Sequence, residues 1–231
     1  MMLFMERVIS RMGAVLVCGV ALLMSPTKAS ADFVYLFDHT WTGASPAGPA
    51  PWVSELFKDI APGTISLTIS NGGLSGTEYL QELYVNLNPT EDPTQLSFQE
   101  TGASAGLTLP TIQTGINSFQ ADGDGKYDIL LSFSTANLGR FAANDYLTYT
   151  ISGIPGLTTS DFEGFLSAHS GGNGPFLGGA HIVSIGANGD SGWDNPSVVT
   201  QTNIVPEPSG GLIFALAAGL GIAARRLFGR S

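Results

Sequence analysis

An acidic cluster that begins at Asp122 is the first place where residue types and spacing could support chemistry. Asp122, Asp124 and Asp128 lie in the run Asp-Gly-Asp-Gly-Lys-Tyr-Asp, and aspartates on a tight glycine turn can converge on calcium, which takes six to eight oxygen ligands. Aligned with an EF-hand loop, they hold the third, fifth and ninth places, but Gln120 and Leu131 stand at the first and twelfth. The run predicts either an incomplete, weak calcium site or a polar hairpin turn. We expect no cofactor other than such a calcium ion.

The tryptophans are a second set of candidate binding residues. Aromatic faces stack on sugar rings, so these three side chains could form a carbohydrate platform. Core packing is the alternative interpretation for large aromatic side chains. The residues concerned are Trp41, Trp52 and Trp193.

Signals for catalysis are sparse along the chain. No HExxH or other paired spacing joins the three histidines, so a catalytic metal would lack ligands, and no GxSxG places a serine nucleophile. His181 lies in an alternating apolar run and is expected to be a packed residue. Acid pairs for glycoside hydrolysis are defined in space, and nothing distinguishes one pair among Glu78, Glu82, Asp161 and Glu163. The sequence therefore predicts a protein that is not an enzyme, with a secreted hydrolase as the remaining alternative.

The segment that must position these residues, 32–204, is strongly acidic. It holds only three strong bases, Lys58, Lys126 and Arg140, against seventeen acids, for a net charge of −14. This balance excludes a nucleic-acid backbone as a partner. It also disfavours direct binding of anionic lipid or polyanionic polymers unless divalent ions bridge them, and it suits an extracellular protein.

Alternation with a period of two residues predicts the fold class of this segment. Ile65, Leu67 and Ile69 share one face of a run in which Ser and Thr take the other face. Similar runs recur between turn signals such as Asn71-Gly72 and Asn188-Gly189. We expect an all-β domain, an antiparallel β-sandwich or jelly roll, with strands near 33–37, 64–70, 83–87, 96–98, 127–133, 147–151 and 181–185. Short helices are expected at 52–60 and from a capping box that begins at Ser160.

The first 31 residues have the features of a secretory signal peptide. Two arginines precede an apolar run of 13 residues, 12–24, which suits a signal peptide and is short for a membrane span. Ala29 and Ala31 supply the small residues that signal peptidase reads, so we place the cleavage after Ala31; a retained anchor is the alternative. Cleavage would remove Cys18, the one cysteine, and would exclude disulfides and thiol catalysis.

The C-terminal segment, 205–231, has three parts in a fixed order. The motif 205–209 reads Val205-Pro206-Glu207-Pro208-Ser209, the apolar stretch 210–224 follows, and Arg225 and Arg226 open a basic end at 225–231. A helix of the apolar stretch would be about 22 Å long, against roughly 30 Å of bilayer hydrocarbon. The basic end favours a transmembrane helix with its arginines in the cytoplasm over a buried core helix.

This tail resembles the PEP-CTERM sorting signal of Gram-negative bacteria that make exopolysaccharide. The resemblance rests on Val205 to Pro208, the short Gly/Ala/Leu stretch and the arginine pair. It implies recognition by an exosortase, with removal of the tail after transient anchoring in the inner membrane. The protein is then expected to be exported to the cell surface or extracellular matrix after cleavage by signal peptidase, with a structural or adhesive role in exopolysaccharide or biofilm. A calcium- or carbohydrate-binding extracellular module is the alternative.

Overall fold

The computed structural model describes residues 32–201, and in this range every strand pairing is antiparallel and the chain is all-β, as predicted. The expected signal peptide and sorting tail, including Ala29, Ala31 and residues 205–231, lie outside the described residues. Within the described part of the chain, no helix is long and apolar enough to cross a membrane.

The strands form one large sheet. Ten of them lie along the path β5-β9-β3-β2-β1-β11-β10-β4-β7-β6, and the short β8 pairs with β4 off this path. The strands are β1 (Asp32–Gly43), β2 (Val53–Ala61), β3 (Thr64–Ser70), β4 (Tyr79–Val85), β5 (Ser97–Ala103), β6 (Thr111–Ala121), β7 (Gly125–Ser132), β8 (Phe141–Ala142), β9 (Tyr146–Ser152), β10 (Gly178–Ile185) and β11 (Asp190–Gln201). Two 3₁₀ turns, η1 (Pro93–Gln95) and η2 (Thr159–Asp161), complete the described elements.

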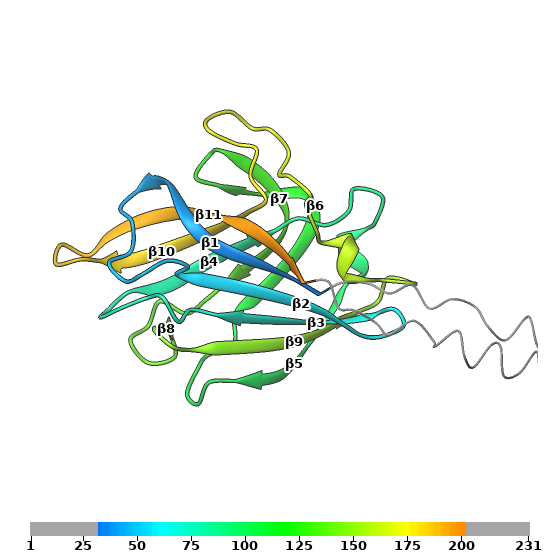
Figure 1. The fold of residues 1–231 in the computed structure, drawn as a ribbon, viewed down its shortest axis with the longest axis horizontal. Helices are drawn as coiled ribbons and strands as arrows, with labels where there is room; N and C mark the ends of the chain where they lie inside the picture. The colour runs from blue at the N-terminus through cyan, green and yellow to red at the C-terminus, as the bar shows by residue number, and fades with distance from the viewer. Residues whose placement is uncertain (1–31, 202–231) are drawn as a thin grey trace, which may run out of the picture.

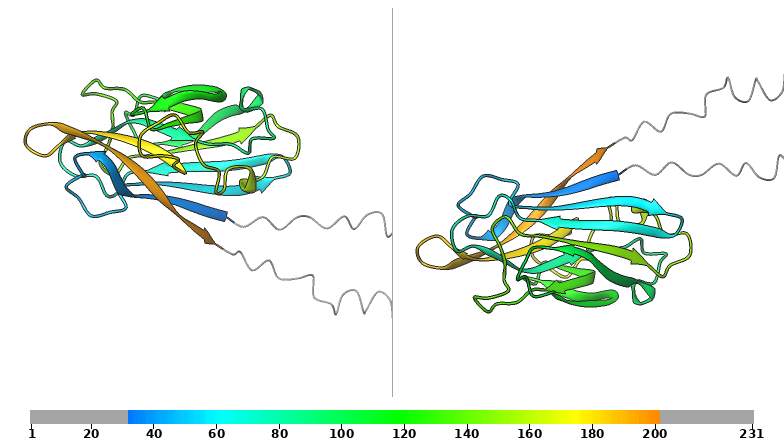
Figure 2. Two further views of the ribbon diagram at one scale, coloured as in Figure 1. Left: turned by 90° about the horizontal axis from the view of Figure 1, so that it is seen from above. Right: turned by 90° about the horizontal axis from the view of Figure 1, so that it is seen from below.

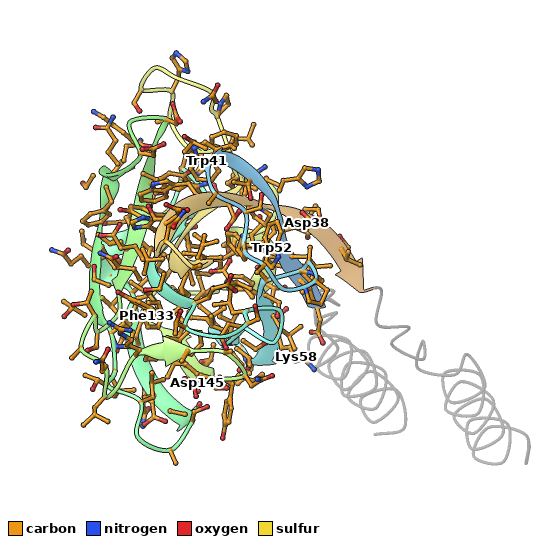
Figure 3. The ribbon with its side chains drawn as sticks, turned by 90° about the vertical axis from the view of Figure 1, so that its left-hand side faces the viewer. Asp38, Trp41, Trp52, Lys58, Phe133 and Asp145 are labelled. Carbon is orange, nitrogen blue, oxygen red and sulfur yellow. The ribbon has the colours of Figure 1, made fainter. Side chains whose placement is uncertain are left out.

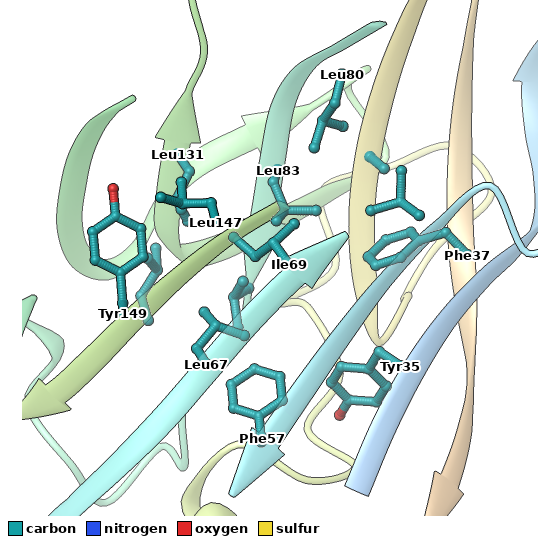
Figure 4. Close-up of a cluster of buried hydrophobic side chains, with 14 of the residues drawn as sticks. Tyr35, Phe37, Phe57, Leu67, Ile69, Leu80, Leu83, Leu131, Leu147 and Tyr149 are labelled. Atoms are coloured by element: carbon teal, nitrogen blue, oxygen red, sulfur yellow. The ribbon is translucent and has the colours of Figure 1, made fainter. Parts of the chain in front are cut away.

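The sheet curls so that its two halves enclose one core (Figure 1). Leu67 and Ile69 of β3 and Leu147 of β9 face Leu83 of β4 and Leu131 of β7 across the interior (Figure 4). Burying one such side chain stabilises the fold by about 1.5–3 kcal/mol, so this core is the main source of stability. The result is a β-sandwich-like fold.

The predicted strand at 64–70 is confirmed residue for residue as β3, and its Ile65, Leu67 and Ile69 are buried. The helix expected at 52–60 is wrong, because this segment is strand β2. Val53, Glu55 and Phe57 alternate into the interior, but the glutamate interrupts the apolar alternation. Val53, Leu56, Phe57 and Ile60 instead follow a helical spacing, which explains the error.

The second expected helix is a single 3₁₀ turn, η2, whose N-cap lies two residues earlier than the predicted Ser160. Its cap is Thr158, whose backbone N–H donates to Asp161 Oδ2 at 2.9 Å, so the capping acid is Asp161 and not Glu163. The sequence also missed β6 and β11. Both are rich in polar residues, and β11 contains Pro196, so neither shows a clear apolar alternation.

The first and last described strands are neighbours. β1 pairs with β11 along its whole length, from Asp32 opposite Gln201 to Gly43 opposite Gly192. Their free ends therefore lie side by side at one end of the domain (Figure 2). The opposite ends of the same two strands carry Trp41 and Trp193.

Candidate functional site

A row of outward-facing side chains crosses the half of the sheet that contains β4, β10 and β11. Glu82 pairs with His181, and His181 pairs with Trp193. The adjacent row contains Leu83 and Ala180, which are buried in the main core. Because successive side chains of a strand point to opposite faces, Glu82, His181 and Trp193 lie on the outer surface.

Aromatic rings stack along this surface. The His181 ring lies 4.3 Å from the Trp193 ring at an interplanar angle of 5°. Trp193 lies 5.9 Å from Trp41 of β1, and Trp41 stacks at 4.4 Å on Phe176 from the loop before β10. Tyr84 of β4 lies 5.7 Å from Trp193. We call these five residues, Trp41, Tyr84, Phe176, His181 and Trp193, the aromatic face.

The aromatic face rests on a small buried cluster of its own. Tyr84, Ala121 and Tyr127 are buried there, and the two tryptophans pack against them while staying half-buried. Gly179 of β10 makes room for Trp41, because a Cβ at this position would meet Trp41 Cη2 at 3.3 Å. The strands therefore position the two tryptophan rings and leave part of their area to solvent.

Partial burial lowers the pKa of His181, although the nearby Glu82 and Asp122 oppose that shift. Glu82 Oε2 lies 3.9 Å from His181 Nδ1 and accepts a hydrogen bond from the Tyr84 hydroxyl at 3.0 Å. His181 Nδ1 and Trp41 Nε1 are buried and have no hydrogen-bond partner among residues 32–201. The face therefore combines aromatic rings with a carboxylate rim, and burial favours the neutral form of its imidazole ring.

The structure separates the three tryptophans. Trp52 is 8% exposed and belongs to the main core, where its Nε1 donates to the Gly48 carbonyl at 2.9 Å. The core-packing interpretation is therefore confirmed for Trp52, whereas Trp41 and Trp193 lie together on the surface. Figure 3 shows Trp41 near one end of the molecule and Trp52 closer to its middle.

The aspartates of the proposed calcium cluster have other partners. Asp124 is buried and accepts a hydrogen bond from the Asn173 backbone N–H at 2.9 Å. Asp128 accepts the N–H groups of Leu87 and Asn117 at 3.0 and 2.8 Å, and Asp122 is exposed. Residues 32–201 contain no group of three or more His, Cys, Asp or Glu side chains that could hold a metal ion. Calcium binding stays a prediction without support from this geometry.

Three of the four acids considered for hydrolysis accept hydrogen bonds from other groups of the fold. Glu78 is buried and accepts the N–H groups of Ala47 and Ser75 at 2.7 and 2.8 Å. Asp161 caps η2, and Glu163 accepts a hydrogen bond from the Thr200 hydroxyl. Of the four, Glu82 is the one that lies beside the aromatic face, next to Tyr84 and His181.

Sequence reasoning missed Tyr84, Phe176 and the role of His181. One signal was present, because the turn expected at 188–189 lies in the loop of the β10–β11 hairpin, which carries both His181 and Trp193. No comparable signal brings Trp41 or Phe176 to this site, since β1 and the loop before β10 meet there through tertiary packing.

No protein-family model and no curated protein matches the chain. Among solved structures, the chain is similar to a family IIIA CBD from Clostridium cellulolyticum, with 12% sequence identity and a TM-score of 0.29. The match covers 65% of this chain and 90% of that one. A likeness at this TM-score carries no argument about the function of this chain.

Proposed function

We propose that this protein is an exported, non-enzymatic protein of the cell surface or extracellular matrix. Its body, residues 32–204, binds matrix glycan through the aromatic face. The stacked rings of Trp41, Trp193, His181 and Phe176 are the observation that carries the proposal. Aromatic rings held rigidly with part of their area in solvent gain free energy when an apolar face of a sugar covers them. The carboxylate of Glu82 at the rim can accept hydrogen bonds from sugar hydroxyls.

Export and sorting belong to the same proposal. The signal peptide and the tail that resembles a PEP-CTERM signal would deliver the body across the inner membrane, where exosortase would act on the tail. Supporting this arrangement, about nine residues of β1 separate Asp32 from Trp41, which is about 30 Å of strand. A tail attached after Gln201 would therefore leave the aromatic face at the end of the domain away from the membrane.

The experiment is a depletion assay in which full-length protein is incubated with insoluble glycans, including matrix polysaccharide of the host. We expect Trp193→Ala to weaken binding at least tenfold, which corresponds to about 1.4 kcal/mol. Tyr146→Ala is the matched control, because Tyr146 is an exposed aromatic residue on the other half of the sheet. Equal loss from both variants, or wild-type affinity in Trp193→Ala, would contradict the proposal. Release of soluble sugar from the glycan would contradict the non-enzymatic part.

A further inference from the structure

A hollow of about 370 Å³ lies around Arg140, away from the aromatic face. Its walls come from residues 76–77, 105–107 and 137–140, together with Ala142 and Asp145. Figure 3 shows Asp145 and Trp41 toward opposite ends of the molecule. The hollow is therefore a separate feature that the proposed function does not use.

Arg140 is held in a defined orientation in this hollow. Its guanidinium carbon lies 4.2 Å from the ring centroid of Tyr79, which is buried. Its Nε donates to the Thr135 carbonyl at 2.9 Å. A stacked ring and one hydrogen bond together fix the plane of the guanidinium, while the two terminal nitrogens remain as donors for another group.

No carboxylate in the described part of the chain lies within 4.0 Å of those donors. Among residues 32–201, the basic and acidic side chains that approach within 4.0 Å are His39 with Asp38, Lys58 with Asp32 and His181 with Glu82. Arg140 belongs to none of them, although this body carries seventeen acids. A half-buried, oriented guanidinium without a carboxylate partner has the geometry to bind a carboxylate through two parallel hydrogen bonds.

We propose that this hollow binds the carboxylate of a hexuronate sugar. The single positive charge of Arg140 balances the single negative charge of a carboxylate. A phosphate or sulfate dianion would keep one unbalanced negative charge, close to the acidic Asp145 in the wall. Uncharged polar groups of Thr77 and Asn137 line the remaining wall and can bond to sugar hydroxyls, and Leu107 offers an apolar side. The volume lies within the usual range of small-molecule pockets.

The charge of the body limits what kind of glycan can carry this sugar. A net charge of −14 repels a continuous polyanion. Charges more than about 8 Å away are largely screened at physiological ionic strength, so a single acidic sugar next to Arg140 is not repelled by distant carboxylates. The ligand is therefore an isolated uronate within an otherwise neutral glycan. This site uses other residues than the aromatic face and stands independently of it.

The test is a titration of the full-length protein with D-glucuronate, followed by NMR through the Nε–Hε signal of Arg140. We expect saturable binding of glucuronate, no binding of D-glucose, and acetate at least tenfold weaker than glucuronate. Acetate as strong as glucuronate would reduce the hollow to a simple anion site and overturn the sugar assignment. Binding of glucose, or no saturable binding of glucuronate, would overturn the proposal as a whole.

Two variants test whether Arg140 supplies the contact. Arg140→Lys keeps the charge but loses the planar fork, and we expect at least tenfold weaker glucuronate binding. Lys126→Gln is the control. Like Arg140, Lys126 has no carboxylate within 4.0 Å among the described residues, but it lies exposed at a hairpin. Its loss should leave glucuronate binding unchanged. If Arg140→Lys fails to fold, Leu138→Glu is the second variant, because Leu138 lines the hollow and is 89% exposed. The new glutamate has the same negative charge as glucuronate and should weaken its binding, whereas Leu138→Gln is the neutral control. Equal glucuronate affinity in Leu138→Glu and Leu138→Gln would contradict the site.

Discussion

The outer surface of the curled sheet has two halves of opposite chemistry. On one half lies the aromatic face. On the other, β2, β3 and β9 present a hydroxyl face made of Ser54, Ser66, Thr68, Ser70, Thr148 and Thr150. Four of these hydroxyls bond in pairs across the strands, Ser54 with Ser70 at 2.9 Å and Thr68 with Thr148 at 3.1 Å.

The difference shows where a ligand could gain free energy. Covering ring surface removes apolar area from water and yields roughly 25 cal/mol per Å². A hydroxyl that is already bonded to its neighbour exchanges one hydrogen bond for another, with a net gain of only about 0.5–1.5 kcal/mol at best. The same sheet therefore supports binding on one half and mainly strand pairing on the other.

The two halves also differ in the acid buried beneath each surface. Glu55 of β2 lies under the hydroxyl face, and neither of its carboxyl oxygens has a hydrogen-bond partner in the described part of the chain. Asp194 of β11 lies on the inner side under the aromatic face, where Oδ1 accepts a bond from Thr40 at 2.6 Å. Burial raises the pKa of Glu55 to about 8 and that of Asp194 to about 6, so the unpartnered acid is the more perturbed one.

The largest expected effect is on the pH dependence of stability in Glu55→Gln. Since the folded-state pKa of Glu55 lies above its unfolded value, its favourable contribution is complete below about pH 4.5 and is lost as the pH rises through about 8. Between pH 5 and pH 9, the free energy of unfolding of the wild type should fall by on the order of 4 kcal/mol because of Glu55, and Glu55→Gln should remove this fall. Urea unfolding at each pH measures it. Asp194→Asn should change the pH dependence of stability over a lower and narrower range, which ends near pH 6. An unchanged slope in Glu55→Gln would show that this carboxyl is solvated.

Asp124→Ala should lower stability by about 1–3 kcal/mol, because the Asn173 N–H then loses its acceptor. Thermal unfolding with and without calcium measures this effect and also tests the calcium prediction. If Asp124 acts only in structure, calcium leaves the melting temperature of both proteins unchanged. A calcium-dependent rise in the wild type that Asp124→Ala abolishes would instead establish a calcium site.

Gly179→Val keeps every aromatic residue, but its side chain should displace the ring of Trp41. We expect glycan binding to weaken about tenfold. Gly102→Val is the control on the other half, where a Cβ meets Tyr146 no closer than 3.7 Å. The depletion assay compares the two affinities, and the melting temperatures confirm that both variants fold. Equal affinities would mean that the position of Trp41 does not matter for binding.

The smallest effect is expected from Thr68→Val with Thr148→Val on the hydroxyl face. Valine retains the shape of threonine and suits a strand, so stability should change by less than about 1 kcal/mol. Glycan affinity should stay within about twofold of the wild type, since this face adds little binding free energy. A loss as large as that of Trp193→Ala would remove the distinction between the two halves.

The sequence predicted the fold class because apolar alternation is strong where one face of a strand meets the core, as in β3. It failed at β2, where buried Glu55 breaks the alternation, and at β6 and β11, whose polar side chains obscure the strand. It identified Trp41 and Trp193 as candidates but could not separate them from Trp52. That distinction depends on which face of the curled sheet each ring occupies, and only tertiary packing decides it.

The most direct test of the central claim uses the three indole N–H signals of the protein, one from each tryptophan. During an NMR titration of the full-length protein with a soluble fragment of a glycan that it binds, we expect the signals of Trp41 and Trp193 to shift together. The signal of Trp52, buried in the main core, should stay in place and serve as the internal control. Saturable glycan binding that leaves Trp41 and Trp193 unshifted would contradict the account.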